Sequence, residues 1–467
     1  MDKIVVFTSI TKNYLAKAKV LAKSFKAFHP DIEFHCVFSE SLDEHEDAKT
    51  YSAFDRVVGL HQVAETFSLQ WLFMHSLVET CTTVKPLYLT KLLKEGVTKV
   101  IYLDPDTKVF HSLETILEWL DSYEICLTPH ITGIDFERQS ILDNEISAAK
   151  HGVYNLGFFA VSSGSEGKKF AQWWADRVVN FGYAQTFMGC FTDQKICDFV
   201  PAYFDKVLIS RHPGLNVAHW NLSTRNITVE NDIYYVNGQP LLFYHFSSFD
   251  SGVGEKMAFK YSEGNKSLVN QIWLKYIKEN EEQGSSESSQ APWPLAYFDN
   301  GQAITLPMRL FYRQNNFCRY IFENPFATSG NSFLKYWHEN DECRKFENAW
   351  KQATDFLSGF SFPGADQFLE KKLTALSTFV KPEIGRLFIY GLNKYASEVI
   401  DILTLKGIDK FILLDIDPEK SVNGATASTP DSFQFNEFDK VIICGKAKQK
   451  EMRATIVRYS TSEPEFL

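Results

Sequence analysis

Short runs of β-branched and aromatic residues alternate with amphipathic stretches over residues 1–260, and this alternation restricts the fold most. Residues 4–8 have the composition of a buried strand, and residues 33–38 have that of a second one. Between them, residues 14–28 carry apolar side chains at helical spacing. A strand, a helix and a strand in this order predict a largely parallel α/β sheet.

Further elements of the same kind follow along the chain. We expect strands at residues 97–103 and 151–161 and a helix at residues 170–181. The region closes with a helix that carries on one face Leu268, Ile272, Trp273 and Tyr276. These elements predict a first domain at residues 1–280.

The length of 467 residues is too great for one compact core, so we expect further domains. The segment EEQGSSESSQAP, residues 281–292, is small, polar and charged, as flexible surface segments are. Residues 293–381 are rich in aromatic residues and helix formers and predict a small helical region. We therefore predict a linker and helical region at residues 281–385 and a C-terminal domain at residues 386–467.

The C-terminal domain has the pattern of a compact β-α-β unit of the Rossmann kind. The runs RLFIYG, FILLDID and DKVIICG predict its strands, and residues 395–406 predict a helix. Only Gly391 remains of a dinucleotide-binding glycine fingerprint, while Asp415 ends the second strand and could hold a ribose hydroxyl. Two interpretations stay open: a bound nucleotide, or a purely structural or protein-binding module.

Composition excludes several classes of protein. Hydrophobic residues make up 45% of the chain and charged residues 23%, as in a globular enzyme. The 48 basic and 58 acidic residues leave a net charge of -10, and no long basic run offsets it. Phosphate binding depends on clustered cations, so we expect no nucleic-acid partner.

Cysteine usage and hydropathy indicate the compartment. The 8 cysteines are scattered and form no C-x-x-C pair, which favours free thiols in a reducing cytoplasm. The chain opens directly on a strand, and no apolar run is long enough for a signal peptide or a transmembrane helix. We expect a cytoplasmic protein without a transmembrane segment, while peripheral membrane association stays open.

The strongest local signal is VIYLDPDTKVF, in which Asp104 and Asp106 follow a buried strand. Ligands of open α/β sheets usually bind at this carboxyl end of a strand. Two carboxylates one residue apart could share Mg2+ or Mn2+, cations that favour oxygen ligands and bridge diphosphate oxygens. A D-x-D pair also occurs by chance on surface turns, so the motif alone leaves both interpretations open.

A histidine follows a second apolar run. In PLLFYHF, His245 comes at the end of a predicted strand, where its imidazole could complete a coordination shell begun by the two aspartates. The alternative is a half-buried ring whose nitrogens bond only to the protein.

The order of motifs resembles that of the GT-A glycosyltransferases, specifically the retaining group of family eight and its bacterial relatives. The resemblance covers residues 1–260 and rests on VVFTSITKNYLAKAKVLAKSF, VKPLYLTKLL, LDPDTKVF, YNLGFFAVS and FTDQKICDFVP. The runs RHPGLNVAHWNLSTRNI and LTPH resemble a narrower bacterial subfamily. The resemblance implies a GT-A, Rossmann-like catalytic domain at residues 1–280, with a nucleoside-diphosphate sugar as donor and Mn2+ or Mg2+ as cofactor.

The resemblance also implies roles for single residues. Asp104, Asp106 and His245 would bind the metal. Asp193 would hold hydroxyls of the donor sugar and Gln194 would lie near the anomeric carbon, so these two are the expected catalytic residues. The expected substrate-binding residues are Thr8, Asn13, Tyr14, Lys85, Asn155 and Gly157.

Two choices within this assignment stay open. The basic residue that reaches the donor could be Lys85 or Lys91, and we favour Lys85. Four residues of the subfamily motif could face either the acceptor or the donor: Asn216, Trp220, Asn221 and Arg225.

The resemblance implies a hexosyltransferase that transfers sugar, with retention, to a glycan, lipid-linked or protein acceptor, as in polysaccharide biosynthesis. Other classes share its features. A sugar nucleotidyltransferase or a nucleotide-sugar hydrolase also places carboxylates and a divalent ion at a strand end. A nucleotide-sensing binding protein would use the C-terminal domain.

Overall fold

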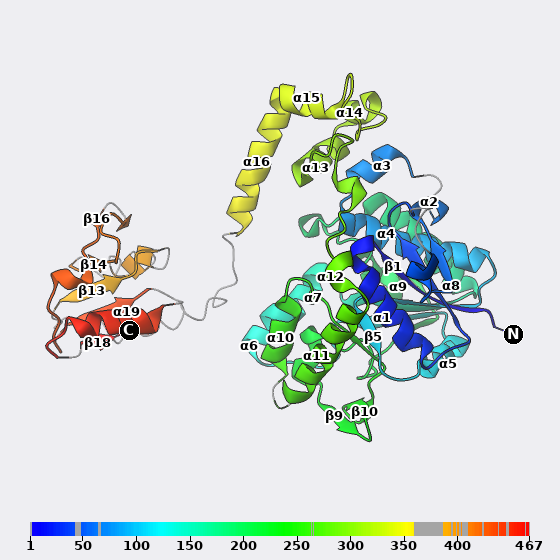
Figure 1. Ribbon diagram of the computed structural model, residues 1–467, viewed down its shortest axis with the longest axis horizontal. Helices are drawn as coiled ribbons and strands as arrows, with labels where there is room; N and C mark the ends of the chain where they lie inside the picture. Colours follow the sequence, from blue (N-terminus) through cyan, green and yellow to red (C-terminus); the bar gives the residue numbers. More distant parts are fainter. Residues whose placement is uncertain are drawn as a thin grey trace. The chain divides into compact units, whose positions relative to one another are not determined.

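The computed structural model describes residues 2–42, 48–63, 67–262, 264, 266–358 and 386–466, the last range with gaps at 394–395, 398, 401–402, 404–409, 423–424, 438, 445–447 and 463. The chain divides into two compact units, Met1–Ala353 and Thr354–Leu467 (Figure 1). Each unit has its own hydrophobic core. Within the described ranges, no helix combines the length and the apolar character needed to cross a bilayer.

A seven-stranded sheet forms the centre of the first unit, with the strand order β3-β2-β1-β4-β7-β6-β8. Strands β1 to β4 run parallel, and so do β6 and β8. This confirms the predicted α/β class with a mostly parallel sheet. The strands are Ile4–Ile10 (β1), Glu33–Phe38 (β2), Arg56–Val58 (β3), Lys99–Leu103 (β4), Ile125–Pro129 (β6), Tyr154–Ser162 (β7) and Val207–Ile209 (β8).

Strand β7 runs antiparallel to both of its neighbours, β4 and β6. Its first residues therefore lie beside the end of β4, where the Asp104 amide donates to the Gly157 carbonyl at 2.8 Å. The strand begins later than the predicted residue 151, because the chain up to that point forms helix α7 (Ile146–His151). Gly152, at a φ of 129°, separates helix from strand in a conformation that favours glycine.

Helices cover both faces of this sheet (Figure 1). Helices α4 (Leu77–Lys94) and α8 (Ser165–Phe181) contribute Tyr88, Trp174 and other apolar side chains to the core on one face. Helices α1 (Leu15–Lys26) and α5 (Glu114–Ser122) contribute to the core on the other face. Both predicted helices are present, α8 beginning five residues before the predicted residue 170.

Two short antiparallel strands form a separate sheet next to the D-x-D motif. Strand β5 (Thr107–Val109) follows the D-x-D motif directly and pairs with β12 (Phe243–His245). Helices α10 (Val253–Tyr261) and α11 (Lys266–Glu282) pack behind β12 around the buried Trp273. The helix predicted to close this region is α11.

Helices run through the described part of the predicted linker and helical region at residues 281–385. Helix α12 (Ser285–Ser288) lies within the predicted linker and contacts α1. Helix α13 (Leu306–Gln314) packs on α3 (Leu69–Met74), where Tyr312 and Phe73 share a buried aromatic cluster. Helices α14 (Asn316–Ile321), α15 (Phe333–Glu339) and α16 (Asp341–Ser358) follow. Residues 359–385 lie outside the described ranges.

The C-terminal unit contains a parallel sheet with the order β14-β13-β17-β18. The predicted strands are present as β13 (Leu387–Tyr390), β14 (Ile412–Leu414) and β17 (Lys440–Ile443), and β18 is Glu465–Phe466. Most of the helix predicted at 395–406 lies outside the described residues. Helix α19 is Gln449–Arg458.

Asp415, the predicted ribose ligand of this unit, is buried and bonded within the protein. Its carboxylate accepts from the amides of Leu392 at 2.8 Å and Asp417 at 3.1 Å, and it forms an ion pair with Lys420 at 3.1 Å. This geometry favours the structural interpretation of the unit over a nucleotide site.

The remaining elements are short. They are the helices α2 (Leu60–Val63), α6 (Arg138–Ser140) and α9 (Val200–Tyr203), the π-helix η3 (Ile141–Glu145), the 3-10 helices η1 (Lys12–Tyr14), η2 (Ala48–Tyr51), η4 (Thr186–Met188), η5 (Lys195–Phe199), η6 (His219–Thr224), η7 (Pro294–Ala296) and η8 (Pro430–Ser432), and the strands β9 (Ile227–Glu230), β10 (Ile233–Val236), β11 (Gln239–Pro240), β15 (Ser421–Val422) and β16 (Ala425–Thr426).

Candidate functional site

The two aspartates of the D-x-D motif and His245 meet at the end of β4. The motif lies between β4 and β5, and the pairing of β5 with β12 aligns Thr107 with His245. His245 Nε2 lies 3.1 Å from Asp106 Oδ1 and 3.9 Å from Asp104 Oδ2. One ligand atom from each residue lies within 4.8 Å of the others, so the three side chains can hold one metal ion.

Burial and charge act against each other at His245. Burial alone would lower the pKa of the ring, but the adjacent Asp106 carboxylate outweighs it and raises the pKa. Burial would likewise raise the pKa of Asp106, and the neighbouring His245 holds it low. A cation that bound between the two carboxylates would compete with a proton for the ring nitrogen.

The space beside these three residues fits a metal and a ligand. Gly157 faces the triad, and a Cβ atom there would lie 2.6 Å from His245 Cε1 and 2.8 Å from Asp104 Oδ2. Any larger residue would fill this space. Two carboxylates and one imidazole are a donor set that Mn2+ and Mg2+ accept when ligand oxygens supply the rest of the shell.

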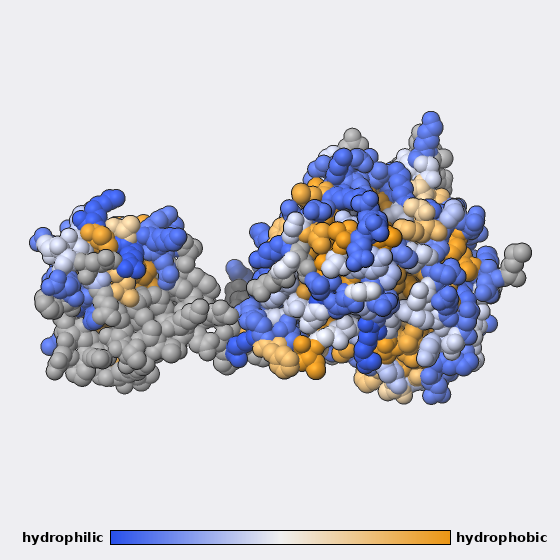
Figure 2. Space-filling model, turned by 90° about the horizontal axis from the view of Figure 1, so that it is seen from below, coloured by the Kyte–Doolittle hydropathy of each residue, from blue (hydrophilic) through white to orange (hydrophobic). Residues whose placement is uncertain are grey.

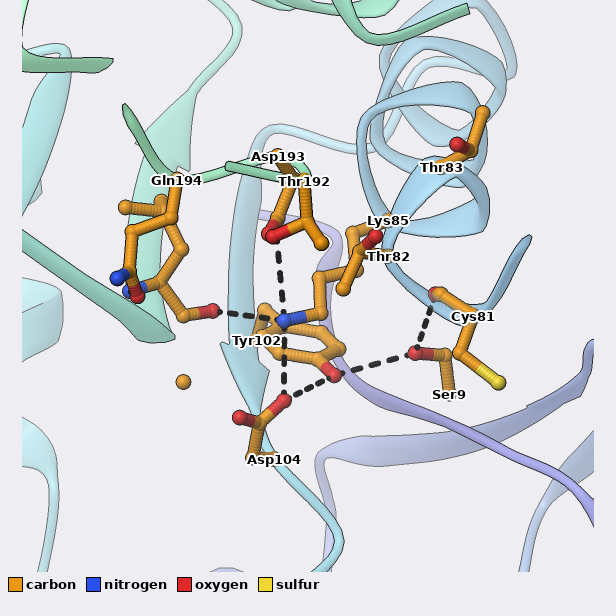
Figure 3. Close-up of polar contacts among 12 residues, drawn as sticks. Ser9, Cys81, Thr82, Thr83, Lys85, Tyr102, Asp104, Thr192, Asp193 and Gln194 are labelled. Atoms are coloured by element: carbon orange, nitrogen blue, oxygen red, sulfur yellow. Dashed lines mark hydrogen bonds and ion pairs between the residues drawn. The ribbon is translucent and has the colours of Figure 1, made fainter. Parts of the chain in front are cut away.

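Lys85 from α4 lies at the centre of a second cluster (Figure 3). Its Nζ is 3.1 Å from Asp104 Oδ1, 3.3 Å from Asp193 Oδ2, and donates to the Leu156 carbonyl at 3.1 Å. Burial raises the pKa of Asp193, although Lys85 opposes this. The choice of Lys85 agrees with this position, whereas Lys91 forms an ion pair with Glu95 at 3.2 Å on the same helix.

The sequence did not predict two residues that bond to this cluster. The Tyr102 hydroxyl donates to Asp104 Oδ1 at 2.6 Å, and Ser9 Oγ lies 3.1 Å from the same hydroxyl (Figure 3). Tyr102 is two residues before Asp104, so both side chains point to one face of the strand. That spacing was the available signal, because an aromatic residue in a buried strand otherwise indicates only core.

A pocket of about 670 Å³ connects the two clusters. Of the predicted substrate-binding residues, Tyr14, Lys85, Asn155 and Gly157 line it, together with both predicted catalytic residues and the triad. The two others do not line it. Thr8 is fully buried, and Asn13 Oδ1 accepts from the Thr11 hydroxyl at 2.5 Å.

The predicted catalytic residue Gln194 is bonded to backbone at both ends of its amide. Its Oε1 accepts from the Leu156 amide at 3.3 Å, and its Nε2 donates to the His151 carbonyl at 3.1 Å. Gln194 therefore fixes the turn that leads into β7 as well as facing the pocket.

Of the four residues of the subfamily motif that were expected to face the acceptor or the donor, one lines the pocket and three do not. Trp220 lines the pocket, and its indole ring meets His245 edge to face at 5.3 Å. Its Nε1 is buried without a hydrogen-bond partner among the described atoms, so it can donate to a ligand. Asn216, Asn221 and Arg225 are buried and do not line the pocket. Arg225 Nη1 donates to the Leu215 carbonyl at 2.9 Å.

Comparison with known proteins finds no family model that matches. Two proteins of Bacillus subtilis strain 168 are similar in sequence. The uncharacterised protein YfnF is 28% identical over 175 residues, which are 37% of this chain and 57% of YfnF. The uncharacterised protein YfnD is 24% identical over 245 residues, which are 50% of this chain and 76% of YfnD. The match thus spans little more than half of the length of YfnF.

Among solved structures, the galactosyltransferase LgtC in complex with donor and acceptor sugar analogues is 16% identical, with a TM-score of 0.33 over 55% of this chain and 96% of its own. Mouse xyloside xylosyltransferase 1 is 12% identical, with a TM-score of 0.32 over 53% of this chain and 98% of its own. Both scores are low, so the function of this chain has to be argued from its own pocket.

Proposed function

We propose that the protein is a metal-dependent glycosyltransferase that transfers a hexose from a nucleoside-diphosphate sugar to a glycan, lipid-linked or protein acceptor. The observation that carries the proposal is the meeting of Asp104, Asp106 and His245 beside Lys85 in one pocket. The motif order along the sequence supports it as well.

A divalent ion bound by the triad would act as a Lewis acid for the departing diphosphate. The chain itself supplies the remaining positive charge through Lys85, whose raised pKa keeps the ammonium charged: burial opposes this, and Asp104 and Asp193 outweigh it. Tyr102 holds Asp104 by a hydrogen bond, so this carboxylate is oriented before a ligand arrives.

Asp193 and Asn155 both line the pocket. Both are buried, and both present groups that bond to hydroxyls. We propose that Asp193 binds donor hydroxyls, that Gln194 lies beside the anomeric carbon, and that transfer proceeds with retention. The incoming hydroxyl would attack from the face that the diphosphate leaves, and the departing phosphate would accept its proton.

The competing classes differ in their products. A sugar nucleotidyltransferase releases pyrophosphate, a hydrolase releases free sugar, and a nucleotide-sensing protein releases nothing. The open pocket with an intact triad favours catalysis over sensing.

The test is a screen of the purified chain with Mn2+ against a panel of nucleoside-diphosphate sugars, with and without simple glycoside acceptors. We expect release of a nucleoside diphosphate from one donor, dependent on Mn2+ and raised by an acceptor. The NMR spectrum of the product should show the anomeric configuration of the donor. Release of pyrophosphate when a nucleoside triphosphate and a sugar 1-phosphate replace the donor, or no turnover with any donor, would contradict the proposal.

A further inference from the structure

Four side chains form a continuous hydrogen-bonded chain that ends at the candidate metal ligand His245. His130 Nε2 lies 3.0 Å from Asn155 Nδ2, and Asn216 Nδ2 donates to Asn155 Oδ1 at 3.0 Å. Asn216 Oδ1 lies 3.2 Å from His245 Nδ1. The chain thus joins the Asn155 of the pocket wall to the metal triad.

One backbone group fixes the direction of every bond in this chain. The Gly157 amide donates to Asn155 Oδ1 at 3.1 Å, and since a backbone N–H can only donate, that atom must be the carbonyl oxygen. The second bond to this oxygen therefore comes from the amino group of Asn216. The oxygen of Asn216 is then left to accept, and His245 must donate to it from Nδ1.

The other end of the chain agrees with this direction. His130 accepts from Asn155 at Nε2, so its proton must lie on Nδ1, where the Val153 carbonyl accepts it at 3.1 Å. A neutral imidazole has this one donor and one acceptor. Burial keeps the ring neutral by lowering the pKa of His130 to about 4.

We infer that Asn216 is the positioning residue that turns His245 Nε2 toward the metal and couples this ligand to Asn155. With its proton committed on Nδ1, the ring offers the Nε2 lone pair to the space between Asp104 and Asp106. Partners of this kind orient metal ligands and contribute substantially to metal affinity. The inference rests on the proposed metal-dependent function.

The backbone of Asn216 is built to hold this side chain. Its φ of 52° is in the left-handed region, which asparagine adopts more readily than most residues. Asn221 Nδ2 donates to the Asn216 carbonyl at 3.0 Å and to the His130 carbonyl at 3.1 Å. The same neighbouring side chain therefore holds both Asn216 and His130, the residue at the far end of the chain from His245.

The test compares Mn2+ binding to the full-length protein and its variants by electron paramagnetic resonance of free Mn2+. N216G removes both hydrogen bonds without backbone strain and should weaken Mn2+ binding by about 10–100-fold. N216D keeps an acceptor for His245 and should bind Mn2+ at least as tightly as the original chain. N237G is the matched control: Asn237 has a φ of 48°, accepts from the Asn226 amide at 2.7 Å and donates to the Thr224 carbonyl at 3.2 Å, and none of these residues lines the pocket.

The outcomes distinguish failure of the positioning role of Asn216 from failure of the proposed metal site. Unchanged Mn2+ affinity in N216G, or equal loss in N216G and N216D, would overturn the positioning role while leaving the metal site intact. If the original chain and H245A bound Mn2+ equally, the metal site of the proposed function would fail, and this inference with it. Thermal unfolding of the metal-free variants checks that N216G and N237G are folded at the temperature at which the affinities are compared.

Discussion

Helix α4 carries two buried ionic clusters about two turns apart, and they are built in opposite ways. At its start, both carboxylate oxygens of Glu79 are occupied by the chain: one accepts from the Ala184 amide at 2.8 Å, the other from Ser76 and from Arg313 at 2.7 and 2.8 Å. Further along, Lys85 binds Asp104 and Asp193, whose surroundings open into the pocket.

The difference indicates that the Glu79 cluster stabilises the fold, whereas the Lys85 cluster is available to bind a ligand. The Glu79 cluster ties α13 to the start of α4 and to the loop at Ala184, which leads to Asp193. Arg309 of α13 adds hydrogen bonds to the carbonyls of Phe73 at 2.9 Å and His75 at 2.8 Å. The predicted helical region is thus attached to one wall of the pocket, and its arginines stabilise residues that position the site.

Loss of a metal ligand should have the largest effect on activity. The triad and the Lys85 cluster contribute to the reaction only by binding the metal and the donor. D104N, D106N and H245A should each reduce nucleoside-diphosphate release by about 1,000-fold or more, since each removes stabilisation of the leaving group. The exposed Asp176 offers the matched control, and D176N should keep full activity. Circular dichroism checks the fold. Turnover of the three variants at the level of the original chain would remove the metal assignment.

Breaking the Glu79–Arg313 ion pair should lower the stability of the fold. R313M leaves Glu79 buried at 3% side-chain exposure without its ion pair, and we expect the free energy of unfolding of the first unit to fall by about 3–5 kcal/mol. The double variant E79M/R313M should recover part of this loss, because no charge is then left buried. Urea denaturation measures both.

The control for this prediction is an exposed pair. Arg344 and Asp341 have 61% and 78% side-chain exposure, so R344M should change stability by less than about 0.5 kcal/mol. Equal losses in R313M and R344M would show that the cluster is not a structural one.

The pattern of the sequence predicted the main sheet and the triad because both depend on local signals. A strand is visible in its own residues: Asp104 and Asp106 come directly after β4, and His245 is the last residue of β12. The antiparallel course of β7 was not visible, because strand direction depends on how distant segments pair. The bonds of Asn216 and the attachment of α13 to α4 were missed for the same reason. Arg313 and Glu79 lie 234 residues apart, so no local pattern relates them.

His75, which lies near Glu79 and Arg313, should also make the stability of the fold depend on pH. Burial lowers the pKa of His75 to about 4, below its ordinary value of 6.5, so the folded chain keeps this ring neutral. Between these values the unfolded chain binds a proton that the folded chain does not. The free energy of unfolding should therefore fall as the pH drops from 6.5 to 4, by on the order of 1–3 kcal/mol for this residue. H75F should flatten the pH dependence, measured by urea denaturation at pH 7 and pH 4.5, and an unchanged slope would contradict the assignment.

Removal of the C-terminal unit should have the smallest effect on turnover. Every described residue that lines the pocket falls between Ser9 and Ser248, and the two apolar cores of the C-terminal unit contain only residues from Leu387 onward. A chain ending at Ser358 keeps α16 and every element that contacts the pocket. We expect it to release nucleoside diphosphate within about twofold of the full chain, since units with separate cores can fold alone. A folded truncation that no longer binds the donor would show that residues 1–280 are not a self-sufficient catalytic domain, and would assign the C-terminal unit a part in donor binding.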